Sequence, residues 1–344
     1  MACSTPWRGR CAGASSSRAA DPVSLPPEFA LIARHFRGLA GEGALGLSDD
    51  AALLAPPPER ELVLAADAMV EGVHYLPDDP PETIGRKLLR VNLSDLAAMG
   101  AEPLAYLMTT ALPRGTTPGW LEGFAAGLAE DQRVFGLHVL GGDTVSTPGP
   151  ACLSLTIIGT VPPGAALRRG GARPGDDLWV SGTIGDGALG LAVLQGRLPG
   201  DAGGHLARRY RLPEPRLALG TALRGLARAA MDVSDGLAQD LGHLLRAGGL
   251  GAVLDLAALP LSPAAAAVVA ADPAWLPRLA TGGDDYELLF AADPADAPGI
   301  LAAARATGTP ATRIGHFTPG PPEARVLGTD GQAVDLPRGG WSHF

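Results

Sequence analysis

Short apolar segments of strand-like composition alternate with segments of helical periodicity along almost the whole chain, and this alternation most constrains the fold. The expected strands are 106–113, 137–144, 151–161, 177–182, 251–256 and 286–290, followed by a short C-terminal strand pair. The segment 61–70 begins as a further strand, which we expect to end at Asp67. The expected helices are 27–40, 81–101, 118–136, 215–229, 235–247, 262–271 and 293–307, where 81–101 forms one helix or two abutting helices. Such alternation is typical of α/β or layered α+β folds.

The length of 344 residues predicts two domains. A composition shift to glycine and proline over 162–191 places the boundary near residue 160. We therefore expect an N-terminal domain over 25–160 and a C-terminal α/β domain over 161–344. Residues 1–24 have the composition of a flexible leader.

Composition excludes several classes of function. The formal net charge of -9 argues against a nucleic-acid partner held through its phosphates. No apolar run approaches the roughly 20 residues that span a bilayer, so we expect no membrane association. Three scattered cysteines are too few for a disulfide framework or a zinc site, which favours a reducing cytoplasm.

Aspartates recur where apolar strands end or helices begin. They are Asp49, Asp50, Asp67, Asp95, Asp143, Asp232, Asp235, Asp284 and Asp285. Any one of them alone is equally explained as a helix cap or a turn residue. As a converging set they would repel one another, and Mg²⁺ would relieve the repulsion because it binds carboxylates and substrate phosphates together.

The stretch 231–245, MDVSDGLAQDLGHLL, concentrates this charge. We predict a helix start here, with Asp232 and Asp235 facing the same way because they are three residues apart. Ser234 and the amides of the first helical turn would then bind phosphate oxygens.

Common phosphate-binding motifs are missing. Lys87 is the only lysine, and the sequence has no P-loop, protein-kinase, Rossmann or G-x-S-x-G signature. If the protein binds phosphates, aspartate-held magnesium must therefore bring them in, with the help of glycine-turn amides and a few arginines.

Seven motifs, in this order, resemble those of the thiamine-monophosphate kinase family, which belongs to the superfamily of aminoimidazole ribonucleotide synthetase. They are GLSDDAALL, AADAMVEGVHY, VNLSDLAAMGAEP, LGGDT, SGTIGDGALGL, MDVSDGLAQDL and GGDDYELLF. The resemblance runs from about residue 28 to the C-terminus. It implies a two-domain aminoimidazole ribonucleotide synthetase-like fold and a homodimer formed through the N-terminal sheets.

The resemblance also implies the activity and the site. Family members transfer the γ-phosphate of ATP directly to thiamine monophosphate with the help of several Mg²⁺ ions. The implied metal ligands are Asp49, Asp67, Asp95, Asp143, Asp232 and Asp235. The implied nucleotide contacts are Gly142, Asp143, Arg169 and Ser234, and the implied contacts to thiamine monophosphate are His74, Asp284 and Trp341.

The chain departs from the family pattern at three places. Asp284 stands where glutamate is usual, Ala65 and Ala66 replace residues that often carry hydroxyls, and Ser48 replaces a glycine. Two alternatives stay open. One is another ATP-using synthetase of the superfamily, of the purine or selenophosphate type, and the other is a non-catalytic homologue that binds nucleotide or metal.

The expected chemistry needs no general base. The second pKa of a phosphate monoester is about 6, so the attacking oxygen is already an anion at neutral pH. The difficulty lies in bringing two anions together, because two unit charges 4 Å apart repel by about 4 kcal/mol at an effective dielectric constant near 20.

Overall fold

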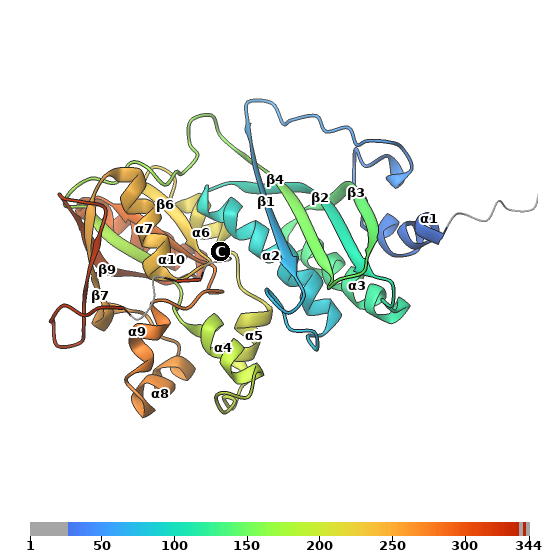
Figure 1. Ribbon diagram of the computed structural model, residues 1–344. Helices are drawn as coiled ribbons and strands as arrows, with labels where there is room; N and C mark the ends of the chain where they lie inside the picture. Colours follow the sequence, from blue (N-terminus) through green and yellow to red (C-terminus); the bar gives the residue numbers. More distant parts are fainter. Residues whose placement is uncertain (1–26, 337–339, 342–344) are drawn as a thin grey trace, which may run out of the picture.

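The computed structural model describes residues 27–336 and 340–341 and shows two β-sheets with helix α2 between them (Figure 1). The predicted leader lies outside these residues. The first sheet has the order β1-β4-β2-β3. Its strands are β1 (Glu61–Val70), β2 (Glu102–Pro113), β3 (His138–Thr147) and β4 (Cys152–Val161). Strand β4 runs antiparallel to β1 and β2, whereas β2 and β3 are parallel.

Helices α2 (Pro81–Ala98) and α3 (Pro118–Phe135) lie on one side of this sheet (Figure 1). Each begins with a proline, whose missing N–H is not needed in the first turn, and Thr117 caps α3 by accepting the N–H of Trp120. Apolar residues of both helices pack against the inner face of the sheet. Before β1 the chain forms α1 (Pro27–Leu31), a π-helical turn (Ile32–Phe36) and a 3₁₀ turn (Arg37–Leu39), where the sequence predicts one helix.

The second sheet has the order β10-β7-β9-β5-β8-β6, and only β7 and β10 are parallel. Its strands are β5 (Asp177–Ser181), β6 (Ala227–Val233), β7 (Gly251–Asp255), β8 (Glu287–Ala292), β9 (Ala311–Thr318) and β10 (Ala324–Leu327). The helices of this half are α4 (Asp186–Leu194), α5 (His205–Arg211), α6 (Leu217–Ala222), α7 (Leu237–Gly248), α8 (Pro263–Ala271), α9 (Trp275–Leu279) and α10 (Ala297–Thr307).

Two sequence predictions are wrong in this half. The helix expected over 215–229 ends at Ala222, because residues 227–233 pair with β8 and become a buried strand. Alanine-rich sequence favours a helix locally, and tertiary pairing overrides that preference. The two expected C-terminal strands are present as β9 and β10, but they do not pair with each other, since β9 pairs with β5 and β7, and β10 pairs with β7.

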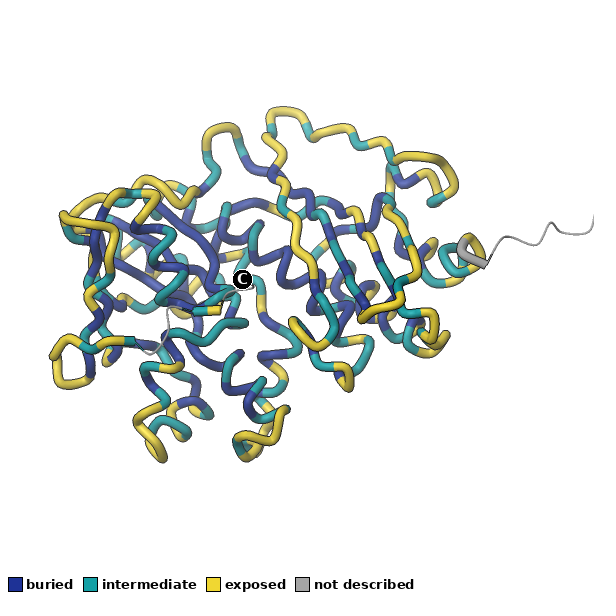
Figure 2. Tube along the Cα trace, in the orientation of Figure 1, coloured by how far each residue is buried: buried dark blue, intermediate teal, exposed yellow. Residues whose placement is uncertain are grey.

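Helix α2 joins the two halves. Its last residues, Ala97 and Ala98, pack into an apolar cluster that includes Trp179, Leu223 and Phe290 of the C-terminal half. The helix is buried along most of its length, whereas β1 is largely exposed (Figure 2). The approach of α6 to α2 requires glycine at position 220, because a Cβ there would lie 2.0 Å from the carbonyl oxygen of Ala97.

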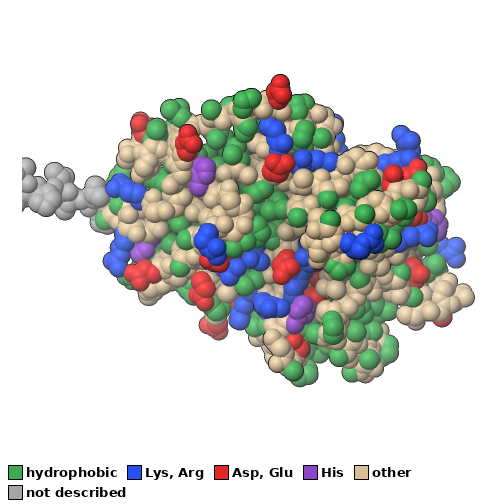
Figure 3. Space-filling model, turned by 180° about the vertical axis from the view of Figure 1, so that it is seen from behind, with side chains coloured by type: hydrophobic (Ala, Val, Ile, Leu, Met, Phe, Trp, Pro, Cys, Tyr) green, Lys and Arg blue, Asp and Glu red, His purple; other side chains and the backbone are tan. Residues whose placement is uncertain are grey.

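Polar contacts also cross the junction. Arg90 of α2 donates to the carbonyl oxygen of Pro213 at 3.0 Å, and Arg224 donates to that of Gly100 at 2.6 Å. Basic and acidic side chains lie next to one another over much of the rear face (Figure 3). Ion pairs exposed on this face contribute little to stability. The apolar contacts that α2 makes with the C-terminal half therefore contribute most to holding the two halves together. Among the described helices, none is long and apolar enough to cross a membrane.

Candidate active site

Acidic side chains from both halves meet at the junction. Asp95 lies on α2, Asp67 on β1, and Asp232 near the end of β6. Ser94 Oγ donates a 2.8 Å hydrogen bond to Oδ2 of the buried Asp232, and so links α2 to the second sheet. Asn92 Oδ1 accepts the backbone N–H of Asp67 at 3.0 Å, and so fixes β1 against α2. The motif NLSD (92–95) of α2 thus brings three carboxylates together: Asp95 belongs to it, and its Asn92 and Ser94 bind Asp67 and Asp232.

The electrostatics confirm that these groups are close together. Burial, and then the charges of Asp232 and Asp67, raise the pKa of Asp95 to about 8, while Arg169 opposes the shift. Burial raises the pKa of Asp232 to about 6 against the hydrogen bond from Ser94. Burial and the charge of Asp235 raise the pKa of Asp67. A cation bound here would relieve both the desolvation and the mutual repulsion.

The donor set fits magnesium that arrives with phosphates. No three His, Cys, Asp or Glu side chains of residues 27–336 and 340–341 form a ready-made metal site. Mg²⁺ usually keeps several waters and takes one or two carboxylates together with substrate phosphates, so a complete protein cage is not required. Asp67, Asp95 and Asp232 supply such carboxylates in a partly dry setting.

The acidic stretch 231–245 differs from its prediction. Asp232 is the second-last residue of strand β6, Asp235 lies in the following bend, and α7 begins only at Leu237. The N–H groups of Ser234, Asp235 and Gly236 donate to Oδ2 of Asp240 at 3.0, 3.1 and 3.2 Å. The amides expected to hold phosphate are therefore bonded within the chain.

Asp240 thus gives the stretch a rigid turn. Burial, and then the charges of Asp232 and Asp235, raise the pKa of Asp240 to about 7, against its bonds from the backbone amides. The sequence offered a signal for this role, because an aspartate at the start of a helix often accepts unbonded amides of the preceding turn.

A cavity of about 910 Å³ adjoins the acidic cluster, and we call it the junction cavity. The predicted substrate residues His74, Asp284 and Trp341 line it, and so do Ser234 and Asp235. The N–H of Trp341 donates to the carbonyl oxygen of Asp235 at 2.9 Å, which fixes the tryptophan at the cavity wall. Asp235 links the two regions, since it lines the cavity and raises the pKa of Asp67.

The loop 282–286 carries Asp284 into this cavity. Asp284 and Tyr286 have left-handed backbones, with φ of 68° and 52°, which are strained for residues other than glycine. Between them the fully buried Asp285 accepts the N–H groups of Gly185 and Gly187 at 2.7 and 3.0 Å. These bonds anchor the loop to the start of α4 and hold its strained conformation.

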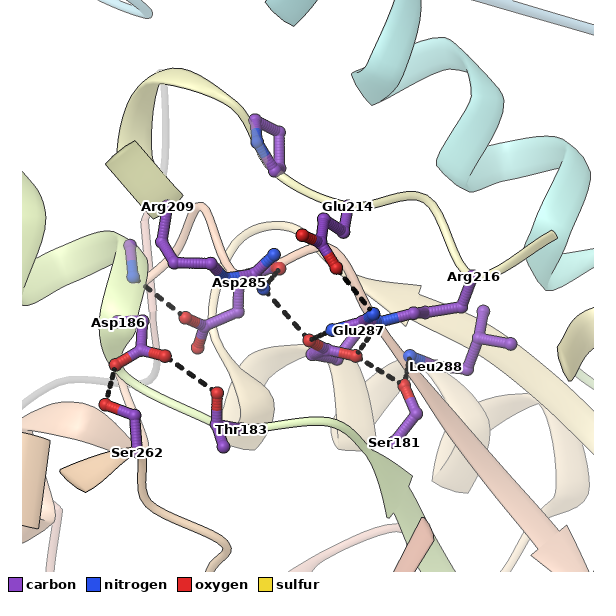
Figure 4. Close-up of polar contacts among 12 residues, drawn as sticks. Ser181, Thr183, Asp186, Arg209, Glu214, Arg216, Ser262, Asp285, Glu287 and Leu288 are labelled. Atoms are coloured by element: carbon purple, nitrogen blue, oxygen red, sulfur yellow. Dashed lines mark hydrogen bonds and ion pairs between the residues drawn. The ribbon is translucent and has the colours of Figure 1, made fainter. Parts of the chain in front are cut away.

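Buried ion pairs support the loop from behind (Figure 4). Arg209 donates to the carbonyl oxygen of Asp285 at 3.0 Å and to Glu287 Oε1 at 2.9 Å. Arg216 binds both carboxylate oxygens of Glu287, which also accepts Ser181 Oγ at 2.6 Å. This network fixes the start of β8 and with it the direction in which the loop leaves the sheet.

Three other predicted site residues lie away from the junction cavity in the folded protein. Asp49, Gly142 and Asp143 line a separate cavity of about 640 Å³ beside β3. Arg169 lies close enough to oppose the pKa shifts of Asp95 and Asp232, so it belongs to the junction.

Strand register explains the separation. Asp143 pairs with Thr109, which pairs with Ser154, and these partly exposed residues share the face without helices. Asp67 pairs with Leu155, which is fully buried against the helices. Paired residues point to the same face, so Asp67 and Asp143 lie on opposite faces of the sheet.

The family departures fall on both faces. Ala66 neighbours Asp67 in β1, so it points to the uncovered face, away from the junction. Ala65 points to the same face as Asp67. Ser48 Oγ donates to the carbonyl oxygen of Leu45 at 2.8 Å, a contact within its own turn.

Comparison with known proteins agrees with the geometry. Residues 48–161 match the family of AIR synthase related protein, N-terminal domain, and residues 173–327 match the corresponding C-terminal domain. Thiamine-monophosphate kinase of Caulobacter vibrioides is 47% identical over 94% of this chain and 93% of its own length. The structure of thiamine-monophosphate kinase from Stenotrophomonas maltophilia K279a is 40% identical, with a TM-score of 0.78 over 90% of this chain and 98% of that one. A structure of AaThiL complexed with AMPPCP and TMP is 29% identical, with a TM-score of 0.73 over 86% of this chain and 91% of that one.

Proposed function

The chain belongs to the AIR synthase related protein family, and within it to the thiamine-monophosphate kinases, and from this premise we propose how its site works. Its activity is the ATP-dependent phosphorylation of thiamine monophosphate to thiamine diphosphate. Asp67, Asp95 and Asp232 hold magnesium at the junction, with Asp235 completing the set. The observation that carries this proposal is the convergence of carboxylates from both halves on helix α2, fixed by the hydrogen bonds of Ser94 and Asn92, beside a cavity lined by both halves.

The residues of the junction cavity bind and orient the acceptor. His74 and Asp284 contact thiamine monophosphate, and the flat face of Trp341 stacks on its cationic ring. Ser234 and Arg169 contact the nucleotide phosphates. Bound magnesium supplies charge neutralisation between the two anionic substrates. The acceptor oxygen is already anionic at neutral pH, so the protein contributes alignment and no general base.

The uncovered face of the first sheet forms a homodimer in this proposal. Leu62, Leu64, Leu107 and Val145 expose between 39% and 62% of their surface on this face. A sheet with an exposed apolar face is stabilised when another sheet packs against it. Because Asp143 lies on that same face, pairing two copies brings Asp49, Gly142 and Asp143 of one copy toward the nucleotide of the other.

Sedimentation of Leu64→Glu tests the dimer. A buried charge at the centre of the interface separates the copies, and we expect a monomer with little activity. A variant that stays dimeric and fully active, or a wild-type protein that is an active monomer, contradicts the proposal. The low cysteine content supports a reducing, cytoplasmic location for the protein.

A coupled ATP assay tests the reaction. We expect ATP consumption with thiamine monophosphate and none with free thiamine or with aminoimidazole precursors. Asp95→Asn abolishes turnover while the protein stays folded, whereas Asp330→Asn, at an exposed turn far along the chain, keeps full activity. Phosphorylation of free thiamine but not of its monophosphate would overturn the assignment, and a fully active Asp95→Asn would overturn the metal role.

A further inference from the structure

Lys87, the only lysine of the chain, is buried in the middle of α2. Its side chain is only 3% exposed. Lysine is almost never fully buried unless its charge is paired, because removing an ammonium group from water costs free energy. A buried sole lysine therefore indicates a specific role for its charge.

The ammonium group has three partners, drawn from both halves of the chain. Nζ donates to the carbonyl oxygen of His74 at 2.9 Å and lies 3.1 Å from Asp284 Oδ1. It also lies 3.8 Å from the ring centroid of Tyr210 in α5, a cation–π contact. Lys87 thus joins α2 and the turn after β1 to two elements of the C-terminal half.

All three partners line the junction cavity, and Lys87 is not among the cavity-lining residues of the described chain. Its action on a bound molecule must therefore pass through His74, Asp284 and Tyr210. The loop that carries Asp284 is anchored at its back by Asp285, and Lys87 is the cation that holds the Asp284 carboxylate at the front.

We propose that Lys87 is the positioning residue for thiamine monophosphate, which fixes Asp284 and the His74 turn across the junction. This rests on the proposed role of the junction cavity as the acceptor site. The ion pair also cancels the charge of one more carboxylate beside a cluster that is already acidic. Without Lys87, Asp284 would add repulsion against the acceptor phosphate, whereas the nucleotide would be affected less.

The length of the acidic side chain at position 284 affects its ion pair with Lys87. The resemblance to the family leads us to expect glutamate there, and this chain has aspartate. Aspartate is one methylene shorter, so its carboxylate stays closer to its own backbone, where Lys87 reaches it from behind the cavity wall. In the proposed complex, the second oxygen of Asp284 contacts the acceptor, since Asp284 lines the junction cavity. Asp284→Glu lengthens this arm and is expected to alter acceptor binding only where Lys87 is present.

Steady-state kinetics of Lys87→Met test the positioning role, since methionine keeps much of the length and removes the charge. We expect KM for thiamine monophosphate to rise about tenfold or more, with KM for ATP within about twofold. Asp284→Asn should also raise this KM, because it loses both the ion pair and the proposed acceptor contact. Lys87→Met should add little in the Asp284→Asn background, because the ion pair is already lost there. Arg133→Met, which removes an exposed cation on α3, leaves both constants unchanged.

The single lysine permits a second readout that does not depend on activity. Protein labelled with ¹⁵N at lysine Nζ gives one side-chain ammonium signal in NMR. We expect this signal to shift in Asp284→Asn and on adding thiamine monophosphate without ATP. A signal unchanged by Asp284→Asn, or a Lys87→Met enzyme with an unchanged KM for thiamine monophosphate, overturns the proposal. If Asp284→Asn shifts the signal but thiamine monophosphate does not, the ion pair stands and the assignment of the cavity, with the positioning role that rests on it, fails.

Discussion

Replacing Asp95 by asparagine changes how the stability of the metal-free protein depends on pH. The pKa of Asp95 is raised from an ordinary value of 3.8 to about 8. Between these two values the unfolded chain has lost the proton and the folded chain retains it. Stability from this group is therefore complete below pH 4 and is lost as the pH rises toward 8.

The magnitude follows from the proton count. One proton released on unfolding lowers the free energy of unfolding by about 1.4 kcal/mol per pH unit. Between pH 5 and pH 7 the wild-type protein thus loses on the order of 3 kcal/mol through Asp95 and the carboxylates coupled to it. Asparagine does not titrate, so Asp95→Asn lacks this loss and is more stable than wild type at pH 7.

Urea unfolding at pH 5, 6 and 7 with a chelator present measures the difference. The slope of unfolding free energy against pH is expected to be less steep in Asp95→Asn than in wild type, and Asp330→Asn serves as the control with the wild-type slope. Magnesium with ATP should stabilise wild type and have little effect on Asp95→Asn. Parallel slopes for wild type and Asp95→Asn would refute the reasoning, because they would place Asp95 in ordinary solvent.

Two further substitutions test how the halves are joined. Ser94→Ala removes the hydrogen bond to Asp232 Oδ2, so we expect urea unfolding to show a loss of about 1.5–3 kcal/mol, and an unchanged midpoint would contradict the contact. Gly220→Ala puts a Cβ 2.0 Å from the Ala97 carbonyl oxygen and should cost about 1–3 kcal/mol by the same assay. Gly115→Ala, with open space around its Cβ, is the control, and equal effects of the two would argue against the close crossing.

Local sequence predicts secondary structure well where the same residues that create the pattern also determine the local fold. Strand β1 begins at the predicted residue 61 and continues to Val70, three residues past Asp67, where the sequence predicts its end. Residues 227–229, the start of strand β6, were predicted as the end of a helix because alanines carry no β-preference, and pairing with β8 makes them part of a strand.

Local sequence likewise predicts the candidate site residues but not their arrangement in space. The motifs identify Asp67, Asp95 and Asp232 as candidate ligands, and their convergence depends on α2 crossing between the halves. The placement of Asp67 and Asp143 on opposite faces follows from strand order and register, which spacing along the chain does not encode. Lys87 was visible only as a sole lysine, since its partners lie far from it in sequence.

Diffraction from a crystal grown with Mn²⁺, a non-hydrolysable ATP analogue and thiamine monophosphate tests the central claim most directly. Manganese replaces magnesium at oxygen ligands and is located by its anomalous scattering. We predict anomalous peaks within bonding distance of Asp67, Asp95 and Asp232, with the acceptor in the junction cavity. Peaks located elsewhere, with these carboxylates bound to no metal, would contradict it.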